Sequence, residues 1–198
     1  MSHPSTTRIG TGDGLVIVDV QNDFLPDGSL AVPHGGDVIA PLHAMIVAFQ
    51  ERLLPIFATR DWHPPNHSSF RAQGGPWPPH CVAGSPGADF PPGLGLPVAA
   101  EVISKATTAE TDAYSGFADT DLAERLRRAG VRRLFVGGVA TDYCVLNTVR
   151  DARTAGFDVV LLLDAVRAIG ANPGDGERAV AEMRRLGAVA AETTAVAG

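Results

Sequence analysis

Short apolar runs of strand length alternate along the chain with segments whose apolar residues recur at helical spacing. The runs are apolar almost without interruption, which is typical of strands covered on both faces. We expect strands at residues 15–20, 55–59, 101–104, 134–138 and 159–163 and near residues 188–191. This series predicts a parallel sheet whose strands are joined by helical crossovers.

Four segments between these runs are predicted to be helices. They are expected at residues 38–53, 121–130, 144–156 and 179–186. Asp37 and Asp121 are candidate N-terminal caps for the first two, and Gly130 is expected to stop the second. The alternation predicts an α/β fold with three αβα layers and a doubly wound, mainly parallel, six-stranded sheet.

Composition agrees with one globular domain. The chain has 198 residues, of which 45% are hydrophobic and 19% are charged. A chain of this length can bury a core of its own. Its hydrophobic content is too high for a disordered chain. We therefore expect one domain over residues 1–198, with a flexible N-terminus over residues 1–13.

The charge of the chain excludes some classes of binding partner. Formal net charge is −6, and no basic patch stands out, so nucleic acid and anionic membranes are not expected as partners. The first residues lack a secretory pattern and no apolar run is long enough for a membrane span, which predicts a cytoplasmic protein. The apolar faces of the predicted helices are compatible with either a monomer or a homo-oligomer. Cys81 and Cys144 are too few for a disulfide framework.

One segment breaks the alternation of strands and helices. Residues 61–100 hold nine of the 15 prolines and show no clear periodicity. A loop of this length in a small domain indicates either a functional excursion or disorder. Because it contains several histidines, an aspartate and a cysteine, we expect a loop that forms part of an active or metal site.

Four reactive side chains follow the expected strands. Asp19, Asp61, Lys105 and Cys144 each lie at or just after the end of a run. Ligands of doubly wound sheets bind at the carboxyl ends of the strands. Taken singly, Asp19 could be a cap acceptor, Lys105 a surface charge and Cys144 a small core residue. Their coincidence at one sheet edge favours a shared site.

These residue types suit nucleophilic catalysis. Cys144 is expected to open a helix, where first-turn N–H groups and a nearby lysine would lower the thiol pKa. The same N–H groups can bind an oxyanion. Asp19 is then available as general base and acid, with Lys105 orienting its carboxylate.

The loop offers a set of metal ligands. Asp61, His63, His67 and His80 provide one carboxylate and three imidazoles, a set suited to zinc, iron or manganese, with zinc favoured. Positions 61 and 63 share a side of an extended segment. A closed structural metal site and a histidine cluster without metal are the competing interpretations.

Several ordered motifs resemble one family. They are VDVQNDF (18–24), TRDWHP (59–64), WPPHCV (77–82), AYSGF (113–117) and GVATDYC (138–144). Together they are similar to the nicotinamidases among the isochorismatase-like cysteine hydrolases. The resemblance implies that family's fold, a catalytic triad of Asp19, Lys105 and Cys144, and metal ligation by Asp61, His63 and His80, with His67 at a position that varies.

The resemblance implies further details of the site. It places a cis peptide between Val139 and Ala140, so that the N–H groups of Ala140 and Cys144 form the oxyanion hole. It also assigns Phe24, Trp77 and Tyr114 to the wall of an aromatic substrate pocket.

The resemblance implies hydrolysis of the small-molecule amide nicotinamide, and also of pyrazinamide, through a Cys144 thioester, in NAD salvage. One alternative is an amidase of the same superfamily that acts on a carbamoyl or ureido compound without a metal. Another is a metal-binding domain that has lost the chemistry. The ligand set argues against the first alternative, and the intact triad argues against the second.

Overall fold

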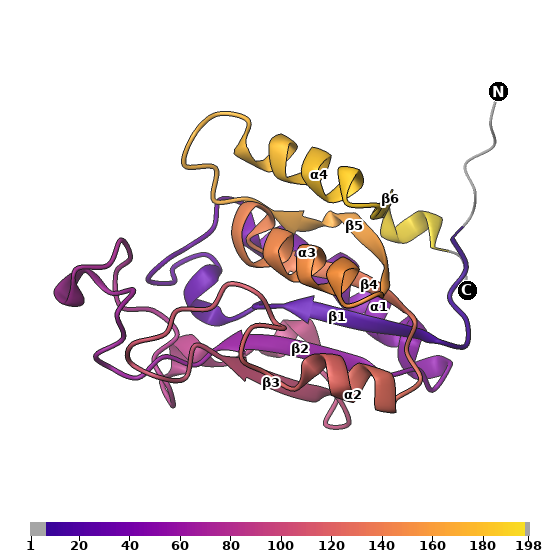
Figure 1. The fold of residues 1–198 in the computed structure, drawn as a ribbon, viewed down its shortest axis with the longest axis horizontal. Helices are drawn as coiled ribbons and strands as arrows, with labels where there is room; N and C mark the ends of the chain where they lie inside the picture. Colours follow the sequence, from indigo (N-terminus) through magenta and orange to yellow (C-terminus); the bar gives the residue numbers. More distant parts are fainter. Residues whose placement is uncertain (1–6, 197–198) are drawn as a thin grey trace.

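A parallel sheet of six strands forms the middle of the molecule in the computed structural model, which describes residues 7–196 (Figure 1). The strands are β1 (Asp13–Val18), β2 (Ile56–Asp61), β3 (Glu101–Lys105), β4 (Arg133–Val139), β5 (Asp158–Arg167) and β6 (Val189–Ala191). Their order is β3-β2-β1-β4-β5-β6, and every neighbouring pair is parallel. The predicted doubly wound α/β fold is confirmed.

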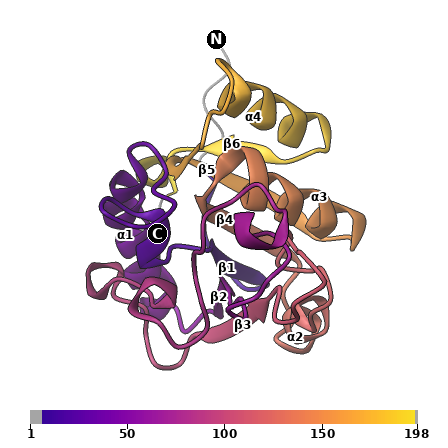
Figure 2. The same cartoon turned by 90° about the vertical axis from the view of Figure 1, so that its left-hand side faces the viewer.

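Helices cover both faces of the sheet, which gives the three predicted layers. They are α1 (Ile39–Glu51), α2 (Leu122–Arg128), α3 (Leu146–Thr154) and α4 (Asp175–Arg185). Viewed end on, α1 lies on one side of the sheet and α2, α3 and α4 lie on the other (Figure 2). Short 3₁₀ turns lie at Asn22–Phe24, Gly35–Val38, Arg71–Gln73, Pro86–Ala88, Pro92–Leu94 and Thr193–Ala195, and a π-helical turn lies at Thr141–Val145.

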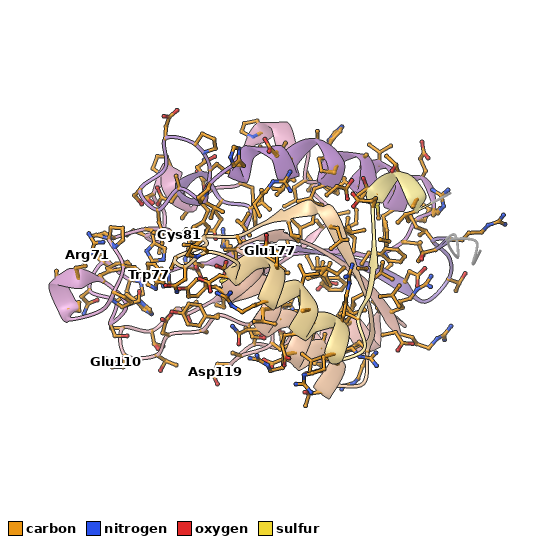
Figure 3. All side chains as sticks on the ribbon, turned by 90° about the horizontal axis from the view of Figure 1, so that it is seen from above. Arg71, Trp77, Cys81, Glu110, Asp119 and Glu177 are labelled. Carbon is orange, nitrogen blue, oxygen red and sulfur yellow. The ribbon has the colours of Figure 1, made fainter. Side chains whose placement is uncertain are left out.

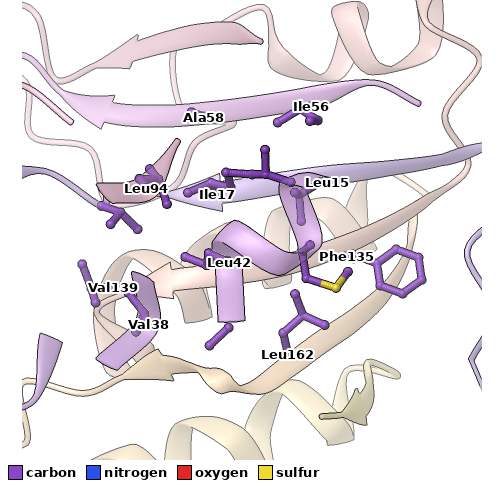
Figure 4. Close-up of a cluster of buried hydrophobic side chains, with 14 of the residues drawn as sticks. Leu15, Ile17, Val38, Leu42, Ile56, Ala58, Leu94, Phe135, Val139 and Leu162 are labelled. Atoms are coloured by element: carbon purple, nitrogen blue, oxygen red, sulfur yellow. The ribbon is translucent and has the colours of Figure 1, made fainter. Parts of the chain in front are cut away.

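The central strand β1 divides the core into two halves. All six of its residues are buried, and successive side chains point to opposite faces. Leu15 and Ile17 pack in the cluster that includes Leu42 of α1 (Figure 4). Val16 and Val18 belong to the other cluster, under α2 and α3. This explains why the strand reads as an unbroken apolar run in the sequence.

The two predicted side-chain caps are absent. The N-cap residues of α1 and α2, Val38 and Asp121, make no capping hydrogen bond with their side chains, and the first N–H of α2 donates to the Thr120 hydroxyl instead. Asp37 lies within a 3₁₀ turn and pairs with Arg167, while the Asp121 carboxylate pairs with Arg125 one turn along α2. Long-range or same-helix arginines therefore compete successfully for these carboxylates. Gly130, with φ of +73°, follows α2 as expected.

Residues 8–13 of the segment expected to be flexible contact the folded domain. The Arg8 carbonyl accepts a hydrogen bond from Arg133 at 2.7 Å, Ile9 is buried, and Asp13 already belongs to β1. Asp13 also pairs with Arg133. This part of the segment is held by an ion pair that sequence periodicity does not reveal. Residues 1–6, which the same prediction covered, lie outside the described residues.

Loops at the carboxyl ends of the strands gather at one end of the molecule, at the left of Figure 1. The segment after β2, from residue 62 to residue 100, contains only short 3₁₀ turns and two isolated bridges, His63 with Val82 and Phe70 with Trp77. It is therefore ordered by local turns and by the side chains beneath it. None of the helices in the described part of the chain is long and apolar enough to cross a membrane.

Candidate active site and metal centre

The site lies where the direction of winding of the sheet reverses. β1 and β4 are neighbours at the centre of the sheet, and the chain moves outward from them in opposite directions. Asp19 directly follows β1, and the turn containing Cys144 directly follows β4. Asp61 and Lys105 are the last residues of β2 and β3. All four are buried, so the predicted convergence is realised at the switch point of the fold.

The Lys105 ammonium group is the centre of this cluster. Its Nζ lies 2.9 Å from Asp19 Oδ2, 3.0 Å from the Ala113 carbonyl and 3.7 Å from Cys144 Sγ. It also donates to Asp61 Oδ1. Oxygen and sulfur atoms of Asp19, Asp61 and Cys144 lie within 4.8 Å of one another, but the lysine already fills the space among them. This second acidic group is therefore bound by an internal cation and is a poor metal site.

Burial and charge set the ionisation of the triad. Burial alone would lower the pKa of Lys105, but the Asp19 and Asp61 carboxylates raise it well above its usual value. Burial raises the pKa of Asp19, against the opposing effect of Lys105. A carboxylate with a raised pKa is a stronger base than one in water. The geometry therefore provides a permanently charged lysine beside a base.

The thiol differs from the sequence expectation. Cys144 lies inside the π-helical turn Thr141–Val145, and α3 begins only at Leu146. Burial raises the pKa of Cys144 well above its usual value, against the opposing effect of Lys105, and the Asp19 and Asp61 carboxylates raise it further. The prediction of a lowered thiol pKa is therefore wrong for this structure, because it counted the helix terminus and the lysine but not desolvation. A base is needed to remove the proton.

The backbone before the nucleophile has the expected form. The Val139–Ala140 peptide is cis. The Ala140 carbonyl accepts hydrogen bonds from Tyr143 N–H at 3.1 Å and Val145 N–H at 3.0 Å, which folds the turn around Cys144. Ala140 and Cys144 line the same cavity.

Three side chains offer a site that fits a divalent metal. Ligand atoms of Asp61, His63 and His80 lie within 4.8 Å of one another, and all three residues are buried. The His63 Nδ1 atom lies 3.2 Å from the Ala106 carbonyl, and His80 Nδ1 lies 2.8 Å from the Pro78 carbonyl. Backbone carbonyls that fix one ring nitrogen and leave the other free are typical of metal-binding histidines. The donor set and its orientation therefore fit a metal ion.

The structure does not bring His67 into this group. Its Nδ1 lies 2.7 Å from the Ser69 hydroxyl and its Nε2 lies 3.1 Å from the Thr111 carbonyl. The His67 ring stacks on His63 with centroids 4.1 Å apart. The chain turns after His63, since His67 N–H donates to the Pro64 carbonyl. An extended segment, as assumed from the sequence, would have placed the ring differently, and the fourth-ligand prediction is not supported.

An aromatic cavity opens above the thiol. Trp77 donates a hydrogen bond from Nε1 to the Tyr114 hydroxyl at 3.3 Å, and Tyr143 packs edge-on against Trp77 with centroids 5.4 Å apart. Phe24 packs against His80. The lining residues are Phe24, Leu30, Val32, Asp61, Trp77, His80, Tyr114, Ala140, Tyr143, Cys144 and Ile169. The three predicted wall residues thus surround both the nucleophile and the metal group.

Several residues of the site were missed by sequence reasoning. Tyr143 adjoins the nucleophile, and this adjacency was an available signal. Thr59 donates a hydrogen bond to Asp19 Oδ1 at 2.7 Å, but only its position near the end of an apolar run could have suggested this. Leu30 and Ile169 come from distant loops and carry no local signal.

A larger groove elsewhere lacks such convergence. It has a volume of about 540 Å³ and lies between the end of β5 and α4, with Leu163, Val180 and Arg184 among its lining residues. It is mostly open and holds no cluster of nucleophile, base and metal ligands. The cavity above Cys144 is therefore the candidate active site.

Comparisons with known proteins agree with this location. Residues 13–195 match the family model described as "Isochorismatase domain". The chain is 37% identical to the nicotinamidase of Escherichia coli (strain K12) over 195 residues, which cover 88% of this chain and 92% of that protein.

Two solved structures are similar over nearly their full length. The pyrazinamidase of Pyrococcus horikoshii in complex with zinc has a TM-score of 0.88 and 50% identity, covering 91% of this chain and 99% of that one. PnC1 from L. infantum in complex with nicotinate has a TM-score of 0.86 and 42% identity, covering 96% and 98%.

Proposed function

The chain belongs to the isochorismatase family, and from this premise we propose that it is a nicotinamidase that hydrolyses nicotinamide to nicotinate and ammonia. The observation that carries the proposal is the buried Lys105, which joins Asp19 and Cys144 to the metal ligand Asp61 below an aromatic cavity. The resemblance to a pyrazinamidase extends the proposal to pyrazinamide.

In the first half of the reaction, Asp19 takes the proton from the Cys144 thiol. The sulfur attacks the amide carbon, and the resulting oxyanion is stabilised by the N–H groups of Ala140 and Cys144. Asp19 then delivers its proton to the nitrogen, and ammonia leaves as the carbon–nitrogen bond breaks. The product bound to the enzyme is a thioester on Cys144.

In the second half, Asp19 acts as base again. It removes a proton from a water molecule, whose oxygen attacks the thioester carbon. The carbon–sulfur bond breaks, the thiol recovers its proton and nicotinate is released. Lys105 stays protonated throughout, since its raised pKa keeps the charge that orients Asp19. One carboxylate therefore serves both steps.

The side chains Asp61, His63 and His80 would hold the metal, which we propose to be zinc on the strength of the relative that is bound to it. A bound divalent ion supplies a Lewis-acid position for the ring nitrogen, or for a water bonded to it, and so helps to orient the ring. The aromatic side chains of Phe24, Trp77 and Tyr114, which line the cavity, would pack against the flat ring. Positioning of this kind can lower a reaction barrier by roughly 7 kcal/mol.

The substrate must open the cavity further. Its volume in this structure is ≈ 30 Å³, well below the roughly 300 Å³ at the lower end of typical ligand pockets. Trp77 and Tyr143 are only half-buried, so we infer that these two side chains turn aside when the ring enters.

The setting of the enzyme is also part of the proposal. We infer that residues 1–198 fold as one domain and that the protein acts in NAD salvage in the cytoplasm, on a small-molecule amide and without nucleic acid or membrane partners.

The test is a discontinuous assay of ammonia release from nicotinamide, pyrazinamide, a carbamoyl amide and a ureido acid. We expect release from the first two. The Cys144→Ala variant should release none while its metal content, measured by elemental analysis, equals that of the wild type.

Two results would overturn the proposal. Release only from the carbamoyl or ureido compound would replace the substrate class. Wild-type turnover by Cys144→Ala would remove the nucleophile.

A further inference from the structure

Two of the proposed metal ligands, His63 and His80, lie in the irregular segment that follows β2. The motif at residues 18–24 supplies Asp19 and Phe24 to the site, but the role of its middle residues is not explained by catalysis. We propose that Gln21, Asn22 and Asp23 form a clamp that sets the spacing of the metal ligands and thereby the affinity for metal. None of the three lines the cavity above Cys144 or belongs to the proposed ligand group, so they are positioning residues. The proposal rests on the metal binding proposed above.

Gln21 fixes the backbone of Asp61 from both sides. Its Nε2 donates to the Asp61 carbonyl at 2.8 Å, and its Oε1 accepts from the Asp61 N–H at 2.8 Å. The same Nε2 donates to the Ala88 carbonyl at 2.9 Å. Gln21 is fully buried. With every one of these bonds made inside the protein, the Asp61 main chain has little freedom to turn its carboxylate away from the metal group.

Asp23 fixes the residue next to His80. Its Oδ2 accepts a hydrogen bond from the Cys81 N–H at 2.7 Å. Cys81 has φ of +46°, a conformation that an L-residue adopts only when surrounding groups hold it. On the other side, the Cys81 carbonyl accepts from the His63 N–H at 3.0 Å. Asp23 and His63 thus hold the Cys81 peptide from its two ends, and this fixes the direction in which the chain presents His80.

Asn22 completes the clamp further along the loop. Its Nδ2 donates to the Pro86 carbonyl at 2.8 Å, and its N–H donates to the Asp89 carbonyl at 2.9 Å. The approach is close, since a Cβ built on Gly87 would lie 2.1 Å from Asp23 Oδ2. Three consecutive residues after β1 therefore fasten the last residue of β2 and the segment from Cys81 to Asp89. Cys81 and Trp77 lie together at this end of the molecule in Figure 3.

The test compares metal affinity with stability of the metal-free protein. Full-length variants are stripped with a chelator, and their dissociation constants for zinc and cobalt are measured by competition with a chromophoric chelator. We expect Asp23→Ala and Gln21→Glu to bind about 10- to 100-fold more weakly, the range typical when groups that orient ligands are removed. Asp23→Asn keeps one acceptor for the Cys81 N–H and should recover most of the affinity.

Matched controls carry the same chemical change away from the metal loop. Asp27→Ala changes an exposed aspartate in the same loop as Asp23, for which the described residues show no side-chain hydrogen bond to the metal segment. Gln50→Glu changes an exposed residue of α1. Both should bind metal like the wild type. Urea unfolding of each metal-free variant shows whether its affinity falls beyond any general loss of stability, and Asn22→Ala serves if Gln21→Glu does not fold.

The outcomes separate the two proposals. Wild-type protein that binds neither metal would overturn the proposed metal site and the clamp with it. Wild-type binding together with unchanged affinity in Asp23→Ala and Asn22→Ala would overturn the clamp alone. Weaker binding with an altered visible spectrum of the bound cobalt supports it, because a merely structural role would leave the ligand geometry of the folded protein unchanged.

Discussion

Lys105 shows how one buried side chain organises this site. It contacts the proposed base, the proposed nucleophile and a proposed metal ligand, although these lie at or after the ends of three other strands. Removing a single partner from a buried ionic cluster costs about 3–5 kcal/mol, because the remaining charges stay unpaired. The catalytic and metal halves of the site are therefore coupled through one ammonium group.

At the same scale, Asp19→Asn tests the proposed proton transfers. The amide keeps the shape and can still accept from Thr59, but it cannot take a proton from the thiol, whose pKa is raised by burial. We expect kcat for nicotinamide to fall by about 10²- to 10⁴-fold. Steady-state kinetics measure this, with circular dichroism to verify folding. A loss below tenfold would mean that another group is the base.

The close pairing of β1 with β4 places the two halves of the triad. Val18 lies opposite Gly138 in the register of these strands. Val18 directly precedes Asp19, and Gly138 lies two residues before Ala140. Gly138 has φ of +129°, and a Cβ there would lie 2.0 Å from the Val18 carbonyl oxygen. The strands can approach at this point only because position 138 has no side chain.

We therefore expect Gly138→Ala to be severely destabilising and to lower activity. The matched control is Gly130→Ala, where φ is +73° but no atom lies within 4 Å of the added Cβ. The control should lose only the cost of the left-handed conformation, about 1–2 kcal/mol. Urea unfolding measures both. Equal losses of stability in the two variants would show that the close approach to β1 is unimportant.

For the whole molecule, metal binding and folding should be linked. The proposed ligands come from β2 and from the loop that follows it, so the assembled group requires the folded chain. At a free metal concentration of 100 times Kd, binding to the native state adds about 2.7 kcal/mol to stability. Thermal unfolding with and without a chelator measures the difference. An identical midpoint in both conditions would argue that no metal binds to the native state.

The sequence alone indicated the fold and most of the site, because these depend on local patterns. Continuous apolar runs reported strands buried on both faces, and polar residues at their ends marked one edge of a parallel sheet. These patterns place Asp19, Asp61, Lys105 and Cys144 at that edge. The motif resemblance supplied the cis peptide at Ala140.

Tertiary structure decided what depends on distance and burial. The turn after His63 directs His67 to Ser69 and Thr111 rather than to the metal group. Desolvation raises the thiol pKa of Cys144, although its position near a helix and a lysine suggested the opposite. Lys105 reaches Asp61 as well as Asp19 because β2 and β3 end at the same register. Spacing along a chain specifies neither the direction of a side chain nor the amount of water around it, and both arise only when distant segments pack together.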